Sequence, residues 1–262
     1  MLTNSAAFTS LEYFRYVPVE GVTIEEVDQY LLQSPHELCC EVTNACNLNC
    51  RVCISGSPAS GTVHLALKEL ISTLETLPDK IARITVTGGE PTLHPDLSEF
   101  VERCSRACEG MVLSTNGYDP SALRRVLKAA PVAVTAISLH GPKHVHDVFV
   151  RRNGAYERAV ASIKIADSLT GAVHVFSTVT GYTVGSLSEL SSELAKLPVS
   201  EHRFTLLKPN GRLECTYIPY ETVLSSIKAI KVPHKVSVKR RDQPFIFLSC
   251  LGKQEVRHVQ KY

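Results

Sequence analysis

Apolar, β-branched segments alternate with amphipathic helical segments over most of the chain. Runs of apolar residues predict six strands, at 37–43, 83–87, 110–114, 133–139, 172–179 and 203–207. Apolar residues at helical spacing predict helices at 65–77, 96–107, 120–129, 155–168, 186–196 and 220–230. Strands that alternate with helices form parallel sheets through right-handed crossovers. The pattern therefore predicts an α/β fold whose six βα units curl into a partial or complete barrel with the helices outside.

Both ends of the chain extend beyond these units. Thr23 and Glu26 form a capping box before apolar residues at helical spacing, which predicts a helix that covers one end of the core. After Pro233, the stretches HKVSVKRR and FIFLSC predict two extra strands. The expected organisation is an N-terminal extension with a capping helix (1–36), a βα barrel (37–232) and a C-terminal extension that completes the active site (233–262).

Composition narrows the classes of partner. Lysine and arginine number 28 against 26 acidic residues, a formal net charge of +2, so nothing marks a nucleic-acid or membrane binder and a small molecule or peptide is expected. The first residues lack the pattern of a signal peptide and no segment is long enough to span a bilayer, which predicts a cytoplasmic protein. In such a protein, nine cysteines indicate metal binding or catalysis rather than disulfides.

Three cysteines lie close together directly after the first predicted strand. Cys46, Cys50 and Cys53 have the spacing C-x3-C-x2-C within the stretch CNLNCRVC. Three thiolates on a [4Fe-4S] cluster leave one iron open, as a cosubstrate that is bound and reduced there requires. A structural zinc site is the alternative, but it needs a fourth ligand at finger-like spacing, and His64 lies outside such a pattern. The spacing therefore favours a redox cluster.

The stretch CNLNCRVC resembles the signature of the radical S-adenosylmethionine (SAM) superfamily, and later motifs agree with it over residues 37–212. The resemblance implies a partial (β/α)6 barrel and one [4Fe-4S] cluster on Cys46, Cys50 and Cys53. It also implies SAM as cosubstrate. An external one-electron reductant such as flavodoxin or ferredoxin then drives cleavage of SAM to methionine and a 5′-deoxyadenosyl radical, which abstracts hydrogen from the substrate.

Motifs at several strand ends resemble the family's contacts to SAM. The stretch Gly88–Pro91 corresponds to one that holds the methionyl amino group through backbone carbonyls and the glutamate, and STNG, SLHGP and LLKPNGR correspond to contacts with ribose, carboxylate and adenine. His140 replaces the aspartate of the common SLDGP form, so it is a candidate to face the substrate instead. The implied contacts are Gly88, Gly89, Glu90, Pro91, Ser114, Asn116, Ser138, His140, Arg152 and Leu207.

Cys250 is the candidate that bears on the type of reaction. It ends the apolar run FIFLS at a predicted strand terminus, where a thiol that donates hydrogen to a substrate radical inverts a stereocentre. The tail lacks the cysteine-rich extension for auxiliary clusters that many peptide-modifying relatives carry, so the chain resembles single-cluster epimerases. We therefore expect epimerisation of a small polar substrate, such as an aminoglycoside or other carbohydrate. The alternative for Cys250 is a buried structural residue.

Other classes of function remain open. A dehydrogenase or lyase shares every motif above, and a peptide- or RNA-modifying enzyme is a further alternative, with the basic run from His234 to Arg241 as its docking patch. A non-catalytic sensor that carries the cluster is the non-enzymatic alternative. Glu41 and Glu214 are candidates to bind substrate ammonium groups. Cys104 and Cys108 continue an apolar helical stripe and are expected in the core.

Overall fold

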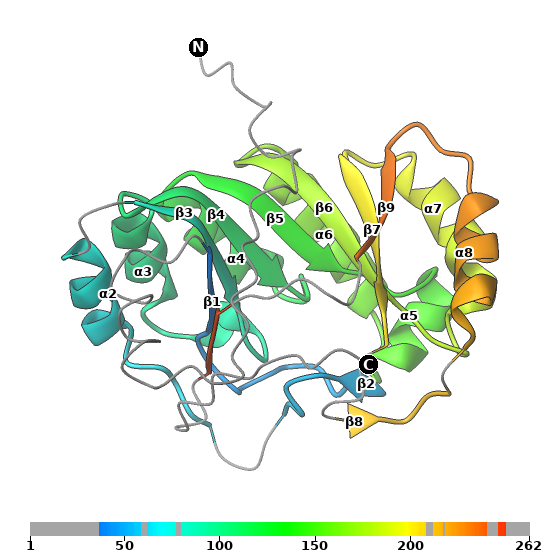
Figure 1. Cartoon of the computed structure of the whole chain (residues 1–262), viewed down its shortest axis with the longest axis horizontal. Coiled ribbons are helices and arrows are strands. Elements are labelled where there is room, and N and C mark those ends of the chain that lie inside the picture. The colour runs from blue at the N-terminus through cyan, green and yellow to red at the C-terminus, as the bar shows by residue number, and fades with distance from the viewer. Residues whose placement is uncertain are drawn as a thin grey trace, which may run out of the picture.

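A computed structural model of the chain describes residues 37–58, 62–76, 80–207, 212–216, 218–239 and 246–249. Its main sheet has eight strands in the order β10-β1-β3-β4-β5-β6-β7-β9, and every neighbouring pair is parallel. Six βα units follow one another along the chain, and the helices cover one face of the curved sheet (Figure 1). The predicted α/β fold with a partial barrel is confirmed.

Each predicted strand and helix of these units is present, with ends within a few residues of the prediction. The strands are β1 (Glu37–Glu41), β3 (Ile81–Thr87), β4 (Cys108–Thr115), β5 (Val132–Ser138), β6 (Thr170–Val179) and β7 (Glu201–Leu206). The helices are α2 (Leu67–Glu75), α3 (Leu97–Cys104), α4 (Pro120–Ala129), α6 (Ala155–Asp167), α7 (Leu187–Leu194) and α8 (Tyr220–Lys228). Within the described ranges, no helix combines the length and apolar character needed to cross a membrane.

The two strands predicted in the tail are β9 (Lys235–Lys239), which pairs with β7, and β10 (Ile246–Ser249), which pairs with β1. Five further elements are too short for periodicity to reveal. They are β2 (Val52–Cys53), which pairs antiparallel with β8 (Arg212–Leu213), helix α5 (Lys143–Phe149) and the 3-10 turns η2 (Pro91–Leu93) and η3 (Val184–Ser186). The helix expected within residues 1–36 lies outside the described residues.

Chain length limits how flat the sheet can be. Only residues 240–245 separate β9 from β10, although these strands lie at opposite edges. A connection of that length reaches at most about 25 Å, whereas the edges of a flat sheet of eight strands lie about 34 Å apart. The sheet must therefore curl, as Figure 1 shows, and its inner face lines a partial barrel.

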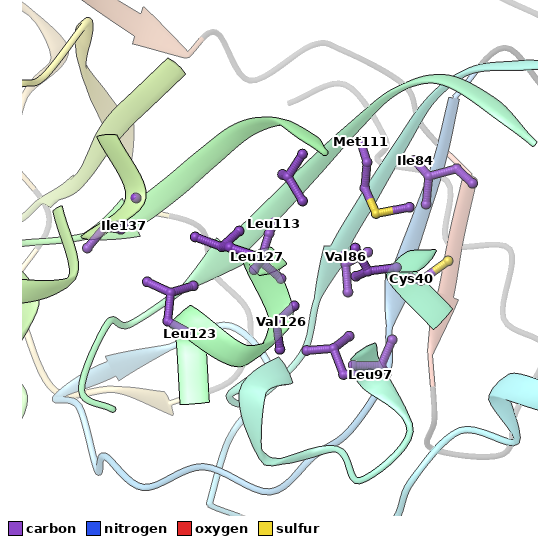
Figure 2. Packing of buried hydrophobic residues seen from close by; sticks show 14 of the residues in the cluster. Cys40, Ile84, Val86, Leu97, Met111, Leu113, Leu123, Val126, Leu127 and Ile137 are labelled. Carbon is purple, nitrogen blue, oxygen red and sulfur yellow. The ribbon is translucent and has the colours of Figure 1, made fainter. Parts of the chain in front are cut away.

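The hydrophobic core lies between the outer face of the sheet and the helices. Ile84, Val86, Met111 and Leu113 from the strands meet Leu97, Leu123, Val126 and Leu127 from the helices (Figure 2). Cys40, Cys104 and Cys108 are buried in the same core, as expected for the last two. Burial raises the pKa of Cys104 to about 12 and of Cys108 to about 11, so both behave as small apolar side chains.

Charged pairs lie on the inner face near the amino ends of the strands. Arg83 on β3 donates two hydrogen bonds to the Glu37 carboxylate on β1, at 2.8 and 2.7 Å. Glu201 on β7 accepts from Arg203 Nε at 3.1 Å, and Lys235 Nζ lies 3.7 Å from its carboxylate. These pairs neutralise the partly buried charges at this end of the barrel.

The imidazole of His202 is buried between the sheet and α7. Its Nε2 lies 2.8 Å from Ser177 Oγ and its Nδ1 lies 3.0 Å from Ser191 Oγ, so both ring nitrogens have partners while the ring is neutral. Burial, followed by the neighbouring His234, lowers the pKa of His202 to about 3. The neutral ring thus links β6, β7 and α7.

This buried histidine makes the free energy of unfolding depend on pH. The pKa of His202 is about 3 in the fold against 6.5 in the unfolded chain, so the unfolded chain gains a proton as the pH falls below 6.5 and the folded protein is destabilised. We expect wild type to lose about 1 kcal/mol more per pH unit in this window than His202→Gln. Urea unfolding at about pH 7 and about pH 5 measures the difference. The exposed His144→Gln is the control, and equal pH slopes in wild type and H202Q contradict the prediction.

Gly88 and Gly89 bring the end of β3 against the loop that follows β1. Gly89 N donates to Thr43 O and Glu90 N donates to Ala45 O, both at 2.7 Å. A Cβ on Gly88, whose φ is 151°, would lie 2.5 Å from Thr43 O, and one on Gly89 would lie 2.2 Å from Ala45 O. Glycine is required here because no larger residue permits this approach of two backbones.

Substitution of Gly89 by alanine is expected to force the two loops apart. We expect Gly89→Ala to lower the free energy of unfolding by about 2 to 3 kcal/mol, because the methyl group overlaps a backbone oxygen that has no room to move. Urea unfolding measures this change. Gly185→Ala is the matched control, since nothing lies within 4 Å of a Cβ there. Equal stability of the two variants would show that the loops do not depend on this contact.

Candidate functional site

The cysteine loop, residues 43–53, lies at the carboxyl end of β1 and carries Cys46, Cys50 and Cys53. Cys46 and Cys50 are half-buried and pack with Leu48 and Phe149 in a small apolar cluster. Cys53 lies in β2, so the β2–β8 pair holds the end of the loop. Active residues of βα barrels lie at the carboxyl ends of the strands, which is where this loop stands.

Electrostatics at the loop favour a positively charged ligand. Burial is the main cause that raises the pKa of Cys46 to about 11 and that of Cys50 to about 12, and the nearby Cys53 raises both further. Leu48 N donates to Cys46 Sγ at 3.4 Å, and Arg212 Nη1 donates to Cys50 O at 2.9 Å. These donors alone leave the thiols protonated, so a metal bound here would have to supply the charge that keeps them as thiolates.

The donor set fits an iron–sulfur cluster better than a single metal ion. Within the described residues, no three His, Cys, Asp or Glu side chains converge on one ion. A zinc ion requires such convergence, with sulfur at about 2.3 Å from the metal. The thiolates of a cubane instead bind separate irons. Three cysteines on one loop can therefore hold a cluster whose fourth iron has no protein ligand.

Glu90 is buried at the junction of three elements. Its side chain is 1% exposed, and its Oε1 accepts from Thr92 N, Thr92 Oγ1 and Thr115 Oγ1 at 3.1, 2.6 and 2.7 Å. Oε2 accepts from Asn116 N at 2.7 Å. Burial raises the pKa of Glu90, and these donors oppose the rise. The carboxylate thus joins the ends of β3 and β4, in addition to any contact with the methionyl amino group. Pro91, the next residue, is buried and starts η2.

Asn116 connects β4 to the cysteine loop. Its Nδ2 donates to Asn47 Oδ1 at 2.8 Å and lies 3.8 Å from Cys46 Sγ, while its Oδ1 accepts from Tyr118 N at 2.8 Å. All polar atoms of the side chain are therefore engaged within the protein. The resemblance predicted a contact of Asn116 with SAM, and the structure adds a contact of Asn116 with Cys46, one of the predicted cluster ligands.

Ser114 and Ser138 lie on the inner face of the sheet. Leu113 and Ile137 precede them in β4 and β5 and are buried in the core on the helix side (Figure 2). Because side chains alternate between the two faces of a strand, both serines face into the barrel, where they are half-buried. Their hydroxyl groups are thus available to a ligand at the carboxyl end of the sheet.

His140 fills the space between the ends of β5 and β6. Its Nδ1 accepts from Thr178 N at 3.1 Å, so the neutral ring carries its proton on Nε2. The ring packs 4.7 Å from Phe149 and 5.7 Å from His146. Burial, followed by the nearby His146, lowers the pKa of His140 to about 3. His140 therefore offers a neutral N–H donor and not the negative charge of the aspartate that is common at this position.

Arg152 lies at the surface, whereas Ser114 and Ser138 are half-buried on the inner face of the sheet. Its side chain is exposed, its Nε donates to Tyr118 Oη at 2.8 Å, and its guanidinium lies over the Tyr118 ring. Leu207 is buried directly after β7, but residues 208–211 of the LLKPNGR motif lie outside the described residues. Cys250 also lies outside them.

The two acids considered for substrate binding both have partners in the protein. Glu41 accepts from Ser55 Oγ at 2.7 Å, and Glu214 forms an ion pair with Arg151. Sequence reasoning missed the residues that hold the site together, chiefly Asn47, Thr92, Thr115, Tyr118 and Arg212. Asn47, Thr115 and Arg212 lie within the motifs CNLNCRVC, STNG and LLKPNGR, and Thr92 and Tyr118 directly follow recognised motifs, so these positions were the signal that could have pointed to them.

Comparisons with known proteins agree with this geometry. Mycofactocin maturase MftC of Mycobacterium tuberculosis (strain H37Rv) is 31% identical over 187 residues, which are 69% of this chain and 47% of MftC. AdoMet-dependent heme synthase of Methanosarcina barkeri is 28% identical over 231 residues, 83% of this chain and 64% of the synthase. The chain therefore spans less than two thirds of either relative.

Similar folds occur among solved structures. The crystal structure of Streptococcus suis SuiB bound to precursor peptide SuiA has a TM-score of 0.66 at 13% identity, over 82% of this chain and 52% of SuiB. The crystal structure of HydG, a maturase of the [FeFe]-hydrogenase, has a TM-score of 0.58 at 12% identity, over 81% of this chain and 54% of HydG. Residues 40–190 match the family model of the Radical SAM superfamily. This chain therefore belongs to the radical SAM superfamily, whose enzymes use a [4Fe-4S] cluster and SAM.

Proposed function

We propose that the chain binds one [4Fe-4S] cluster on Cys46, Cys50 and Cys53 and reductively cleaves SAM to generate a 5′-deoxyadenosyl radical. When bound, the cluster supplies the electron, which an external carrier has delivered, and the radical abstracts hydrogen from a substrate inside the curved sheet. The observation that carries this proposal is the set of hydrogen bonds that joins the cysteine loop to the ends of β3 and β4. A cluster that transfers an electron to a substrate needs a fixed position relative to it.

The protein's own residues hold the cofactors in place. Asn116 Nδ2 and Leu48 N point at Cys46 Sγ, and such donors to cluster sulfur stabilise the more negative, reduced state. The hydroxyl groups of Ser114 and Ser138 and the Nε2–H of His140 are the groups we assign to SAM or substrate. Glu90 positions this set through its buried hydrogen bonds. Burial of the ends of the strands excludes water from the reactive radical.

The Cys46, Cys50 and Cys53 triple alanine variant tests the proposal. After anaerobic reconstitution with iron and sulfide, wild type is expected to hold about four irons per chain, as a cubane requires. With dithionite and SAM it should release 5′-deoxyadenosine. The variant is expected to lose both signals, because no thiolate remains. Chromatography of the nucleoside and iron analysis give the readouts. Wild type that holds four irons but forms no nucleoside under strong reduction would support the sensor alternative.

Two classes of substrate have separate support. The relatives favour a peptide, because MftC is named a maturase of mycofactocin and SuiB was solved with its precursor peptide SuiA. A small polar substrate such as an aminoglycoside, with epimerisation of a carbon centre, is supported by Cys250, which directly follows the last residue of β10 in the sequence. The two proposals assign different roles to Cys250. Only epimerisation requires a thiol that returns a hydrogen atom.

Replacement of Cys250 separates these proposals. For an epimerase, Cys250→Ala should still form 5′-deoxyadenosine but no inverted product, and wild-type product made in D2O should gain one deuterium from the exchangeable thiol. Mass spectrometry of products from aminoglycosides, sugars and peptides measures this. Cys104→Ala, in the core, is the control. Inverted product from C250A rules out Cys250 as the donor, and modified peptide without deuterium favours peptide maturation.

A further inference from the structure

Two arginines beside the cysteine loop lie on one tyrosine. The guanidinium carbon of Arg152 lies 5.1 Å from the centre of the Tyr118 ring, and that of Arg158 on α6 lies 4.7 Å from it. Arg152 Nε also donates to Tyr118 Oη at 2.8 Å, and Arg158 Nη1 donates to Tyr118 O at 3.3 Å. Both arginines are exposed. We call Tyr118, Arg152 and Arg158 the arginine platform.

The positive charge of the platform is not neutralised by its surroundings. Among the ion pairs of the described residues, none includes Arg152 or Arg158. The nearby acids already have other partners: Lys143 pairs with Asp147 and Glu157, and Arg151 pairs with Glu214. Of these seven side chains four are positive and three are negative, which leaves a local excess of one positive charge.

The platform adjoins the cluster ligands. Tyr118 packs against the small apolar cluster, built around Leu48 and Phe149, that also contacts Cys46 and Cys50. A second connection runs through hydrogen bonds, because Tyr118 N donates to Asn116 Oδ1 and Asn116 Nδ2 lies 3.8 Å from Cys46 Sγ. A protein that docks on the platform therefore comes close to the cluster without entering the barrel.

We propose that the arginine platform is the docking surface for an acidic electron-carrier protein that reduces the cluster. The proposal rests on the function proposed above and adds the place where the carrier binds. One electron passes from the carrier's flavin hydroquinone or reduced iron–sulfur centre to the cluster. The carrier is oxidised by one electron, the cluster is reduced by one, and no bond forms or breaks.

The chemistry of the platform suits such a partner. Unpaired positive charge steers an acidic protein toward this face and raises the association rate. Arginine and tyrosine are enriched at protein interfaces, and stacking on the ring restrains both guanidinium groups before the partner arrives. On the inner face of the barrel, by contrast, Arg83 and Arg203 are each paired with a carboxylate.

Charge reversal at Arg158 tests the docking surface. The variants are Arg158→Glu, the milder Arg158→Gln, and Lys164→Glu as matched control, because Lys164 is exposed on the same helix nearer the amino ends of the strands. Each reconstituted protein is mixed with a reduced bacterial flavodoxin or a [4Fe-4S] ferredoxin, and stopped-flow absorbance gives the rate of cluster reduction. Binding of the oxidised carriers is measured separately by biolayer interferometry, at low and high salt.

We expect R158E to slow reduction by the preferred carrier about tenfold at low ionic strength, with R158Q intermediate. The difference should shrink at high salt, where charges are screened. K164E should match wild type, and dithionite should reduce all four proteins equally. Equal rates for R158E and K164E, or no salt-sensitive binding of either carrier by wild type, overturn the proposal. If wild type reduced with dithionite yields no 5′-deoxyadenosine, the proposed function is overturned instead. The binding measurements then still test whether a carrier docks on the arginine platform.

Discussion

The hydrogen bonds between the end of β3 and the loop after β1 are the constraint on which the rest of the site depends. Gly89 N and Glu90 N bind the backbone of Thr43 and Ala45, and the absence of side chains at Gly88 and Gly89 lets the two segments meet. The buried Glu90 carboxylate extends this junction to β4. The loop that carries the cysteines is thereby fixed by backbone contacts before any cofactor arrives, which is how a rigid scaffold preorganises a reactive site.

Two buried polar side chains at the carboxyl end of the sheet, Glu90 and His140, have hydrogen-bond partners, and these contacts favour one arrangement of the strand ends. Glu90 accepts four hydrogen bonds, and His140 accepts one from Thr178 N at the end of β6. A buried polar group without a partner costs about 1 to 3 kcal/mol. Alternative packings that leave these groups unpaired are therefore disfavoured, and the ends of β3, β4, β5 and β6 keep fixed relative positions.

Charged side chains on the inner face of the barrel differ from those beside the cysteine loop. On the inner face, Arg83 pairs with Glu37 and Arg203 pairs with Glu201. Outside, beside the cysteine loop, the guanidinium groups of Arg152 and Arg158 remain without carboxylate partners and stack on Tyr118. In the docking proposed above, the electron carrier approaches from outside the barrel while the substrate binds inside it. Arg152, predicted from the resemblance to contact SAM, lies at the surface on Tyr118 instead.

The sequence by itself determined the fold class and the chemistry. Alternation of apolar strands and amphipathic helices located all six βα units, and the spacing of Cys46, Cys50 and Cys53 indicated the cluster, because both signals are local in the chain. Only the tertiary structure decided that Glu90 and Asn116 bind neighbouring loops, that Arg152 lies on Tyr118, and that β10 pairs with β1. These contacts join residues far apart in the chain, so they depend on strand register and helix packing, which no local pattern encodes.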